Sequence, residues 1–513
     1  MRKYPKYYLV LFTVLILISC SKESDSSQSY SPSVTSGNQT SSNTLPSSLL
    51  QSVTEPYEEG NYIWRNLNFW YYWQEFVTDL SDNKASSNTS YASFINENSN
   101  PDLFFESLKH PDDRFSFYVD DYDPILDALS GIETSDGIEY KLYLECNDQN
   151  VYGWVKYVEN PSPGESAGIS RGDIFNSING TRLTVNNYEG LLNGDNITYG
   201  FADASLDSGC GVTSSTNISH TLNKVELNNN PIWGTAIYHN GTNQGFESVI
   251  GAKVGYIVYN GFIKENESTG VNYDELLSGV FGLFKVSGVS EVVIDLRFNG
   301  GGYLSSLVNL ASMITGGFSD STLIQTEYNS KVTNQYGNTE YKFVNSLEDG
   351  GSLNSMFLDR VYILTSSSTA SASENLINGL DPYIDVIQIG DTTYGKNETN
   401  IFIHANEQNI LNTTPNHKVG LYTVIGKNSN SVGFKDFSNG LIPDITVQDG
   451  VTNSSQLGNL NEKLFKAALE HICNCNFSVG IEDEYDYNDR EIKIPIPSYK
   501  KILIDDIIDV NIE

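Results

Sequence analysis

The chain has 513 residues, of which 39% are hydrophobic and 12% aromatic, which is enough apolar material for two or three globular domains. Its formal net charge of −34 argues against nucleic-acid binding, because a phosphate backbone would be repelled. The same charge suits a soluble exported protein and favours cationic substrates.

The N-terminus has the order of a secretory signal. A basic start, MRKYPKYY, precedes an apolar run from Leu9 to Ile18 that is too short to span a bilayer. The run continues into Leu-Ile-Ser-Cys, which resembles a bacterial lipobox and implies cleavage before Cys20 and acylation of that cysteine. A plain signal peptide with a chance cysteine is the alternative. We therefore expect residues 1–19 to be a lipoprotein signal peptide.

Residues 20–50 are rich in Ser, Thr and Asn and carry few large apolar side chains. Such a segment cannot bury enough surface to offset the entropy of ordering, so we expect a flexible tether. The later cysteines do not have the spacing of a zinc finger, and the pairing of any disulfide cannot be derived from the sequence. They are Cys146, Cys210, Cys473 and Cys475.

Residues 51–110 are predicted to form an N-terminal helical subdomain. Aromatic and apolar residues recur at helical spacings over residues 61–80, which favours packing in a helical core over an aromatic cofactor site. The tryptophans of this stretch are Trp64, Trp70 and Trp73. Residues 104–121 predict a further helix that ends near Pro111.

Residues 111–225 contain one informative run, residues 151–180. It has the order strand, Pro/Gly turn, short helix, strand and Asn-Gly hairpin turn. The run resembles the PDZ domains linked to bacterial proteases, and the matching residues are Ser162-Pro163, Ala167-Gly168-Ile169, Gly172-Asp173-Ile174 and Ile178-Asn179-Gly180. The segment is therefore expected to be a PDZ-like, β-rich domain.

The PDZ resemblance also suggests a peptide-binding loop. Tyr152, Gly153 and Trp154 stand where such domains carry an apolar-Gly-apolar loop. Backbone amides of that loop would bind a peptide C-terminus while the peptide adds to the sheet as a strand. The alternative interpretation of Gly153 is a bulge within a strand.

After residue 250, strands alternate with helices, which predicts an α/β core. Residues 253–263 and 360–368 predict strands, residues 290–314 a buried strand, a glycine turn and an amphipathic helix, and residues 385–396 a strand followed by a turn that ends in Lys396. Turns that follow such strands face a ligand crevice. The glycine turn Asn299-Gly-Gly-Gly lacks the pattern of a P-loop. Its backbone amides are suited to holding an oxyanion instead.

Ser371 allows two interpretations. Ser371-x-x-Glu374 has the pattern of a capping box, so the serine could simply begin a helix. Lys396 follows 25 residues later, with one helix and one strand between, so both residues emerge at the same sheet edge. A buried lysine can act as a general base if its pKa falls from about 10.4 to roughly 7–8. A solvated turn cation is the alternative for Lys396.

Other serine mechanisms have less support. The chain has six histidines, and none of them lies in a turn of this kind. The pattern Gly-x-Ser-x-Gly occurs at residues 164–168, but there it belongs to the run that resembles a PDZ domain and follows a Pro/Gly turn, not a buried strand. A Ser-His-Asp hydrolase is therefore not indicated.

Taken together, the motifs resemble the tail-specific, or C-terminal processing, serine proteases, especially lipid-anchored members from Bacteroidota-type bacteria. The resemblance covers roughly residues 60–472 and rests on VGYIVYNGF, VVIDLRFNGGG, TASASE, TYGK and GLIPDITV. It implies an α/β fold in which residues 226–475 form a ClpP/crotonase-like protease core. The PDZ-like domain and the N-terminal helical subdomain complete the expected architecture.

The resemblance also implies the roles of site residues. Ser371 would be the nucleophile, Lys396 the base, and the amide of Ala372 one half of the oxyanion hole. The other half would be a glycine amide, from Gly301 or Gly302. Many members carry a glutamine one turn after the lysine; here Asn400 has that spacing and is the candidate for orienting the base.

The function implied is an envelope endopeptidase that recognises an exposed C-terminal tail and cuts through an acyl-enzyme, without metal or organic cofactor. Its partners would be proteins or peptides with exposed C-termini, and the membrane through the lipid anchor, in the outer membrane or cell envelope. The alternative is a peptide-binding, PDZ-bearing lipoprotein with a weak or inactive protease core. A carbohydrate-binding lipoprotein is a further rival, but no repeated sugar-binding unit occurs.

Residues 476–513 lie outside the resemblance. The acidic part of this C-terminal extension is expected to be a solvated face. The alternating pattern EIKIPIP predicts an added strand.

Overall fold

The computed structural model describes residues 58–476 and 491–492, except 130–131, 206–211, 241–245, 267–268, 349, 405–414 and 452–454. The predicted signal peptide and tether, with Cys20, lie outside the described residues. Among the described helices, none combines the length and the apolar character that crossing a bilayer requires.

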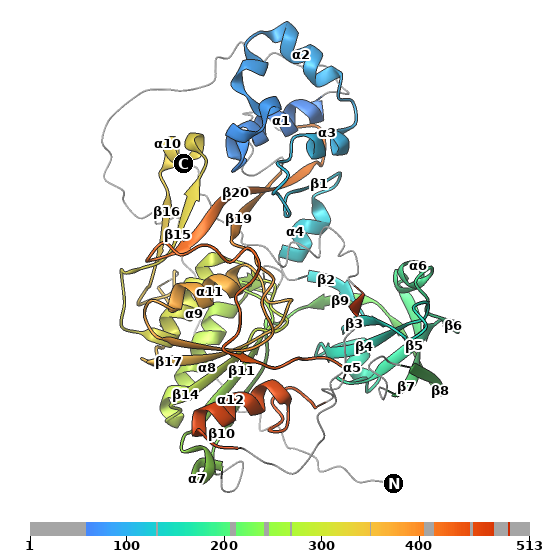
Figure 1. Ribbon diagram of the computed structural model, residues 1–513, viewed down its shortest axis with the longest axis vertical. Helices are drawn as coiled ribbons and strands as arrows, with labels where there is room; N and C mark the ends of the chain where they lie inside the picture. Colours follow the sequence, from blue (N-terminus) through green and yellow to red (C-terminus); the bar gives the residue numbers. More distant parts are fainter. Residues whose placement is uncertain are drawn as a thin grey trace, which may run out of the picture. The chain divides into compact units, whose positions relative to one another are not determined.

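A six-stranded sheet organises the α/β core (Figure 1). Five of its strands are parallel and follow one another in space: β11 (Val254–Tyr259), β14 (Glu291–Asp295), β17 (Arg360–Thr365), β18 (Asp385–Gly390) and β21 (Ile445–Thr446). The sixth strand, β10 (Ile232–Tyr238), pairs antiparallel with β11 at the edge. Since parallel strands need crossover connections, helices must cover the faces of this sheet.

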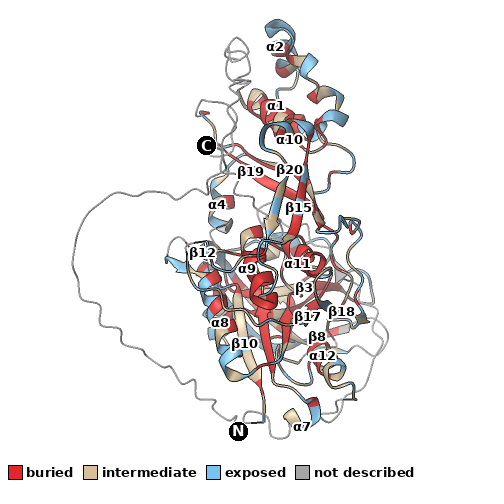
Figure 2. Ribbon diagram, turned by 90° about the vertical axis from the view of Figure 1, so that its left-hand side faces the viewer, coloured by how far each residue is buried: buried red, intermediate tan, exposed pale blue. Residues whose placement is uncertain are grey.

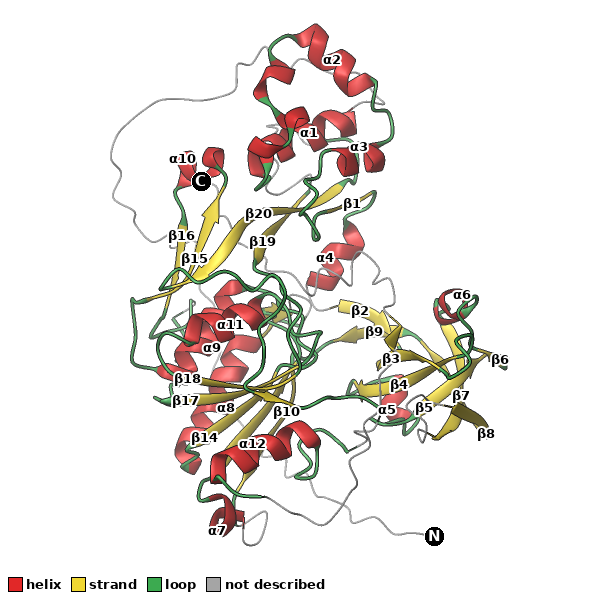
Figure 3. Ribbon diagram, viewed as in Figure 1, coloured by secondary structure: helices red, strands yellow, loops and turns green. Residues whose placement is uncertain are grey.

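Alternate side chains of the sheet pack against two different sets of helices. On β11, Ile257 and Tyr259 belong to a cluster with α8 (Tyr273–Ser287), α9 (Leu304–Thr315) and α11 (Ala372–Leu380). Tyr256 and Val258, which point the other way, belong to a cluster with α7 (Phe246–Ile250) and α12 (Lys463–Cys473). The sheet is thus the buried middle layer of an α/β sandwich (Figures 2 and 3), which confirms the predicted fold class.

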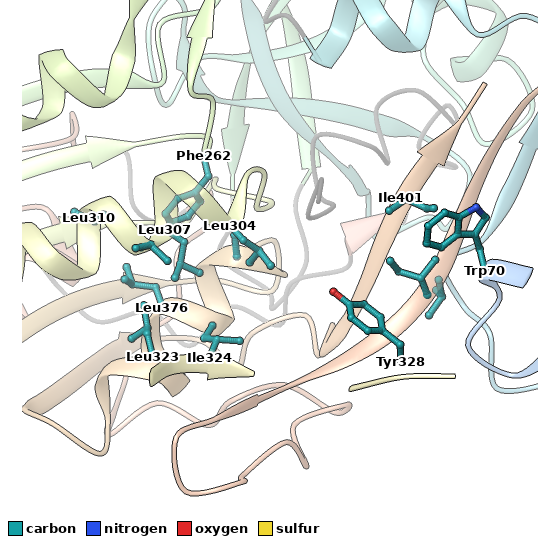
Figure 4. Close-up of a cluster of buried hydrophobic side chains, with 14 of the residues drawn as sticks. Trp70, Phe262, Leu304, Leu307, Leu310, Leu323, Ile324, Tyr328, Leu376 and Ile401 are labelled. Atoms are coloured by element: carbon teal, nitrogen blue, oxygen red, sulfur yellow. The ribbon is translucent and has the colours of Figure 1, made fainter. Parts of the chain in front are cut away.

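A second, antiparallel sheet is built around the long strand β20 (Gly420–Asn430). Its other strands are β1 (Phe117–Val119), β15 (Thr322–Tyr328), β16 (Thr339–Lys342) and β19 (Glu398–Ile403). The larger apolar cluster runs from the core helices to this sheet. In Figure 4 it reaches from Leu307 on α9 to Trp70 and Ile401, so the N-terminal part shares one core with the α/β part.

The N-terminal part is helical, as predicted. It consists of α1 (Glu58–Trp70), η2 (Gln74–Phe76), η3 (Thr78–Leu80), η4 (Asp82–Ala85), α2 (Asn88–Asn96) and α3 (Pro101–Ser107). Trp64, Trp70 and Trp73 are buried in the apolar cluster, which confirms their predicted role in a core.

The structure contains the helix that was predicted to end near Pro111, but it ends earlier. Helix α3 ends at Ser107, and residues 117–119 form strand β1. The reason is a side chain in the turn: Asp113 Oδ1 accepts hydrogen bonds from the amides of Phe115 and Ser116, at 3.0 and 2.8 Å. Such local bonds favour a turn over a helix.

A seven-stranded sheet contains the run that resembles a PDZ domain. Its strands are β22 (Glu491–Ile492), β3 (Ile138–Leu144), β4 (Val151–Val158), β5 (Ile174–Ile178), β7 (Asn196–Ser205) and β8 (Val212–Asn223), with β6 (Thr181–Arg182) beside β5. Helix α5 (Pro163–Ser166) follows β4, and helix α6 (Tyr188–Leu192) precedes β7. Asn179 and Gly180 form the predicted hairpin turn with φ values of 52° and 75°.

The remaining elements are short. Helix α4 (Asp123–Leu129) follows β1, helix α10 (Ser330–Tyr336) connects β15 to β16, and two small ribbons complete the described part. The ribbons pair β2 (Ile132–Ser135) with β9 (Val225–Asn228) and β12 (Glu265–Asn266) with β13 (Val271–Asn272). Because β1 pairs with β20, the chain just after residue 110 joins the second sheet, and the predicted boundaries at 110 and 225 stay predictions.

The predicted carboxylate-binding loop at Tyr152, Gly153 and Trp154 is wrong. These residues lie inside strand β4, where Gly153 is paired with Leu142 of β3 and Phe175 of β5. A side chain at position 153 would come within 2.1 Å of the Phe175 ring, so glycine is required by packing. Since strands occupy both edges of β4, this segment cannot bind a peptide carboxylate.

A chain of charges joins the seven-stranded sheet to the α/β core. Arg171, in the turn before β5, pairs with Asp449, whose other oxygen lies 3.4 Å from Arg297 Nη1. Arg297 is fully buried and forms further ion pairs with Asp295 at 2.8 Å and Glu462 at 2.7 Å. Glu462 also caps α12, accepting from the amide of the third helical residue. Arg297 thereby ties the turn after β14 to helix α12.

We predict that Glu462→Gln lowers the melting temperature, since breaking a buried ion pair typically costs about 3–5 kcal/mol. Burial alone would raise the pKa of Glu462, but Arg297 holds that pKa below its ordinary value of 4.5. The ionised carboxylate therefore stabilises the fold above about pH 4.5, and this contribution is lost as the pH falls through the lowered value.

The measurement is thermal unfolding of wild type and variant across acidic to neutral pH. Lys466→Ala is the matched control, because Lys466 makes a solvent-exposed pair on the same helix. The difference in melting temperature between wild type and Glu462→Gln should narrow as the pH falls. A difference that is absent, or constant with pH, would contradict the assignment.

Candidate active site

The predicted site residues lie in turns at the ends of three neighbouring parallel strands. The glycine turn follows β14, Ser371 follows β17, and Lys396 follows β18. The Asn299 carbonyl of the glycine turn accepts from Ala370 N at 3.2 Å and Ser373 Oγ at 3.1 Å. The turns therefore adjoin at one sheet edge, as the sequence spacing predicts.

Ser371 is buried and holds an unusual backbone conformation. Its φ of 58° and ψ of −115° are strained for a residue other than glycine, a feature that concentrates at functional sites. The Ser371 amide donates to Glu374 Oε2 at 2.9 Å, which is one half of the predicted capping box. The hydroxyl lies toward the helix amides but forms no cap hydrogen bond, and it has no hydrogen-bond partner among the described residues. It remains available as a nucleophile.

Glu374 connects the serine to the lysine, a role that the sequence pattern did not reveal. Its Oε2 accepts from the amides of Ser371 and Lys396, at 2.9 and 2.8 Å. Its Oε1 accepts from Gly395 N at 2.7 Å and Thr393 Oγ1 at 2.5 Å. Burial raises the pKa of Glu374 to about 7, against the effect of these hydrogen bonds. One carboxylate thus fixes the backbone at both proposed catalytic positions.

Lys396 is buried, with 0% of its surface exposed, so it is not a solvated turn cation. Its Nζ lies 5.2 Å from the ring centroid of Phe115 and 5.7 Å from that of Tyr422. The preceding Gly395 has a φ of 87°, and a side chain there would meet the Ser438 carbonyl at 2.4 Å. The tight turn and the aromatic rings together give the lysine a dry surrounding.

The two glycines proposed for the oxyanion hole differ. The Gly301 amide already donates to Asn299 Oδ1 at 2.9 Å. Gly302 has a φ of 135° and packs so closely that a side chain would come within 2.3 Å of the Phe262 carbonyl. Ala372 is the first residue of α11, where amides have no intrahelical acceptor. Gly302 and Ala372 are therefore the better pair of donors.

Asn400 lies within strand β19, opposite Val424, and not on a helical turn. It is buried, and neither its Oδ1 nor its Nδ2 has a hydrogen-bond partner in the described part of the chain. An unpaired buried amide is costly, which is compatible with a role that is completed by another group. Its orienting role stays a prediction.

We predict that Glu374→Gln loosens both turns, because the amide nitrogen of glutamine cannot accept from the backbone donors that face it. Each buried donor left unpaired costs about 1–3 kcal/mol. Hydrogen–deuterium exchange should quicken around Ser371 and Lys396, and the melting temperature should fall. Because the pKa of Glu374 is raised, the wild-type protein loses stability as the pH rises from 4.5 to about 7. The difference in melting temperature between wild type and Glu374→Gln should therefore narrow as the pH rises over this range.

The control for this variant is Glu275→Gln on the exposed face of α8. Exchange at the two turns that is unchanged in Glu374→Gln would contradict the proposed link.

Comparison with known proteins agrees with this geometry. Residues 253–447 match the model of peptidase family S41, and residues 58–117 match the model of the peptidase S41 N-terminal domain. No curated protein matches the sequence.

Among solved structures, a protein of Bacteroides fragilis NCTC 9343 described as an S41 protease is 24% identical, with a TM-score of 0.63 over 80% of this chain and 97% of that chain. The photosystem II D1 C-terminal processing protease is 17% identical over 86% of this chain and 100% of that one; its TM-score is 0.44, too low to support an argument. The first of these structures supports the fold. Two segments of the chain, residues 253–447 and 58–117, therefore match domains of peptidase family S41, a family of serine proteases.

Proposed function

We propose that the protein is an endopeptidase in which Ser371 is the nucleophile and Lys396 the general base. The observation that supports this best is that the Glu374 carboxylate accepts hydrogen bonds from the backbone amides of both residues. A buried, strained serine with an unpaired hydroxyl and a buried lysine are brought to one sheet edge. Both positions match those that the family resemblance assigns.

In this mechanism, neutral Lys396 Nζ accepts the Ser371 Oγ proton as Oγ attacks the carbonyl carbon of the scissile peptide bond. The amides of Ala372 and Gly302 would donate to the oxyanion that forms. When the carbon–nitrogen bond breaks, the leaving amine takes the proton from Lys396, and an ester to Ser371 remains. Water, deprotonated by Lys396, then hydrolyses the ester and restores the serine.

A second candidate function is peptide binding without efficient cleavage. The observation in its favour is Asn400, whose shorter side chain stands where the family pattern has glutamine and lacks hydrogen-bond partners among the described residues. We favour the first candidate because one carboxylate, Glu374, accepts from the amides of both Ser371 and Lys396.

We predict that Ser371→Ala and Lys396→Ala abolish cleavage of an unstructured protein with an apolar C-terminus, while the fold persists. Lys396→Arg should fail too, since guanidinium does not lose its proton in the working range. Wild-type activity should rise with pH as the lysine becomes neutral. Lys435→Arg, at an exposed ion pair, is the control. Near-normal turnover of Lys396→Arg would refute the dyad.

We further propose that the seven-stranded part is a PDZ-like domain that receives substrate tails at the edge of β3. That strand has β4 on one side, and on its other side the described residues Glu491 and Ile492 pair antiparallel with Tyr143 and Leu142. The contact supports an edge that accepts an extended peptide by strand addition. The C-terminal extension would then compete with substrate for the same edge.

Deleting residues 477–513 should therefore tighten the binding of a tail peptide, measured by fluorescence anisotropy on the Ser371→Ala protein. Tail-peptide affinity that is unchanged by the deletion would exclude this edge.

The proposed location is the cell envelope, with the protein held by a lipid on Cys20. The support is the lipobox-like sequence and the tether that follows it. We predict that Cys20→Ser removes lipid labelling and stable membrane attachment, because each buried methylene of an acyl chain contributes about 0.8 kcal/mol. Membrane fractionation that is unchanged in the variant would contradict the anchor.

A further inference from the structure

The turn between α3 and β1 belongs to the N-terminal domain yet lies at the proposed base. Asp113 organises this turn, accepting from the amides of Phe115 and Ser116 and from the Tyr71 hydroxyl at 2.8 Å. Ser116 Oγ in turn accepts from Val424 N at 2.9 Å, which attaches the turn to strand β20. Asp113 and Ser116 are buried, so the turn is held in a defined position.

Two side chains project from this turn to the lysine. The Phe115 ring centroid lies 5.2 Å from Lys396 Nζ, and the ring also contacts Tyr394 at a centroid distance of 6.1 Å. Arg114 donates through Nη2 to the carbonyl of Gly395, the residue before the lysine. The Arg114 guanidinium also lies 4.7 Å from the Phe115 ring centroid. The turn thus contacts both the backbone and the amine of the base.

We propose that Arg114 and Phe115 are positioning residues for the general base, so that the N-terminal domain completes the active site. Phe115 covers the lysine amine and keeps water from it, and Arg114 fixes the Gly395 carbonyl and places a permanent positive charge nearby. The proposal rests on the proposed function, because it presupposes that Lys396 acts as the base.

The Phe115 ring has two opposing effects on the pKa of the lysine, and their sizes decide which one prevails. A lysine that loses its hydration can have its pKa lowered by as much as about 3–5, and a like charge nearby acts in the same direction. An aromatic ring attracts an ammonium and opposes this; at a desolvated site the attraction is worth about 2 kcal/mol, or roughly 1.5 pKa units. The exclusion of water outweighs the attraction of the ring. Removing the ring should therefore make the lysine easier to protonate.

Other ionisable groups surround the lysine and must be considered in any pH experiment. Glu374 on α11 accepts from the Lys396 amide and has a pKa of about 7. Glu398 on β19 is paired with Lys427 at 3.5 Å. Tyr422 on β20, Tyr394 of the same turn and Arg114 are further charged or titratable groups among the described residues packed there. Glu374, with its pKa of about 7, titrates in the range expected of the proposed base.

The test compares pH–rate profiles of wild type, Phe115→Ala, Phe115→Leu and Arg114→Met on one tail-bearing substrate. Phe76→Ala is the matched control, because Phe76 belongs to the same N-terminal part and is 72% exposed. The Lys396 ¹³Cε NMR signal is followed in a Ser371→Ala background and assigned by its absence in Lys396→Arg. This signal reports the lysine alone, whereas the rate also contains Glu374.

We expect the acidic limb of the Phe115→Ala pH–rate profile to move to higher pH by about one unit. At pH values below the limb, kcat should be about tenfold lower than in wild type, and above the limb it should be close to the wild-type value. Phe115→Leu, which keeps an apolar cover, should shift less, Arg114→Met should shift in the same direction, and Phe76→Ala should match wild type. The NMR titration should move with the rate. KM should change less than kcat.

A ratio of variant to wild-type rate that is the same at every pH would overturn the proposal, because a merely structural role acts equally at all pH values. If Phe115→Ala fails to fold, Phe115→Leu and Arg114→Met decide by the same criterion. Near-normal turnover of Lys396→Arg would instead refute the dyad. An inactive Lys396→Arg with pH-independent ratios for the turn variants would refute the role of Arg114 and Phe115 alone.

Discussion

The active-site edge depends on one buried carboxylate, that of Glu374. Carboxylates are rarely buried because dehydration of the charge is unfavourable, and here the raised pKa shows that the penalty is not fully offset. In return, the carboxylate fixes the relative position of two turns, because the four donors that surround it come from both of them. Serine and lysine are therefore aligned by a shared acceptor before any substrate binds.

A second buried charge, that of Arg297, lies in the turn after β14 and stabilises the same edge of the sheet. Its partners come from β14, from the segment after β21 and from the start of α12. Because Asp449 is shared with Arg171, the cluster also reaches the seven-stranded sheet. Buried pairs of this kind fix relative positions more reliably than they add stability. The oxyanion turn is thus linked to elements far away in the sequence.

The antiparallel sheet and the N-terminal helices enclose the lysine. Strand β20 carries Tyr422, and its Val424 amide donates a hydrogen bond to the N-terminal turn. That turn carries Phe115. The apolar cluster that joins α1 to β20 keeps these parts together (Figure 4). The segment that matches the S41 N-terminal domain, residues 58–117, thus contributes Phe115 to the buried surroundings of Lys396.

Features that depend on local pattern could be predicted from the residues alone. Alternation of strands and helices predicted the α/β core, and glycine and small residues after buried strands located the turns that carry Ser371, Lys396 and Gly302. Such signals are local because strand ends, turns and caps are set by neighbouring residues.

Tertiary structure alone decided the rest. An apolar-Gly-apolar triplet looks the same in a loop and in a strand, and only pairing with β3 and β5 placed Gly153 inside β4. The Ser-x-x-Glu pattern predicted a cap at Glu374, but its bonds to Gly395 and Lys396 come from a turn that is adjacent only in the folded chain. The contact of Phe115 with Lys396 spans an even longer separation in the sequence. These contacts depend on which strands become neighbours, and no local pattern contains that information.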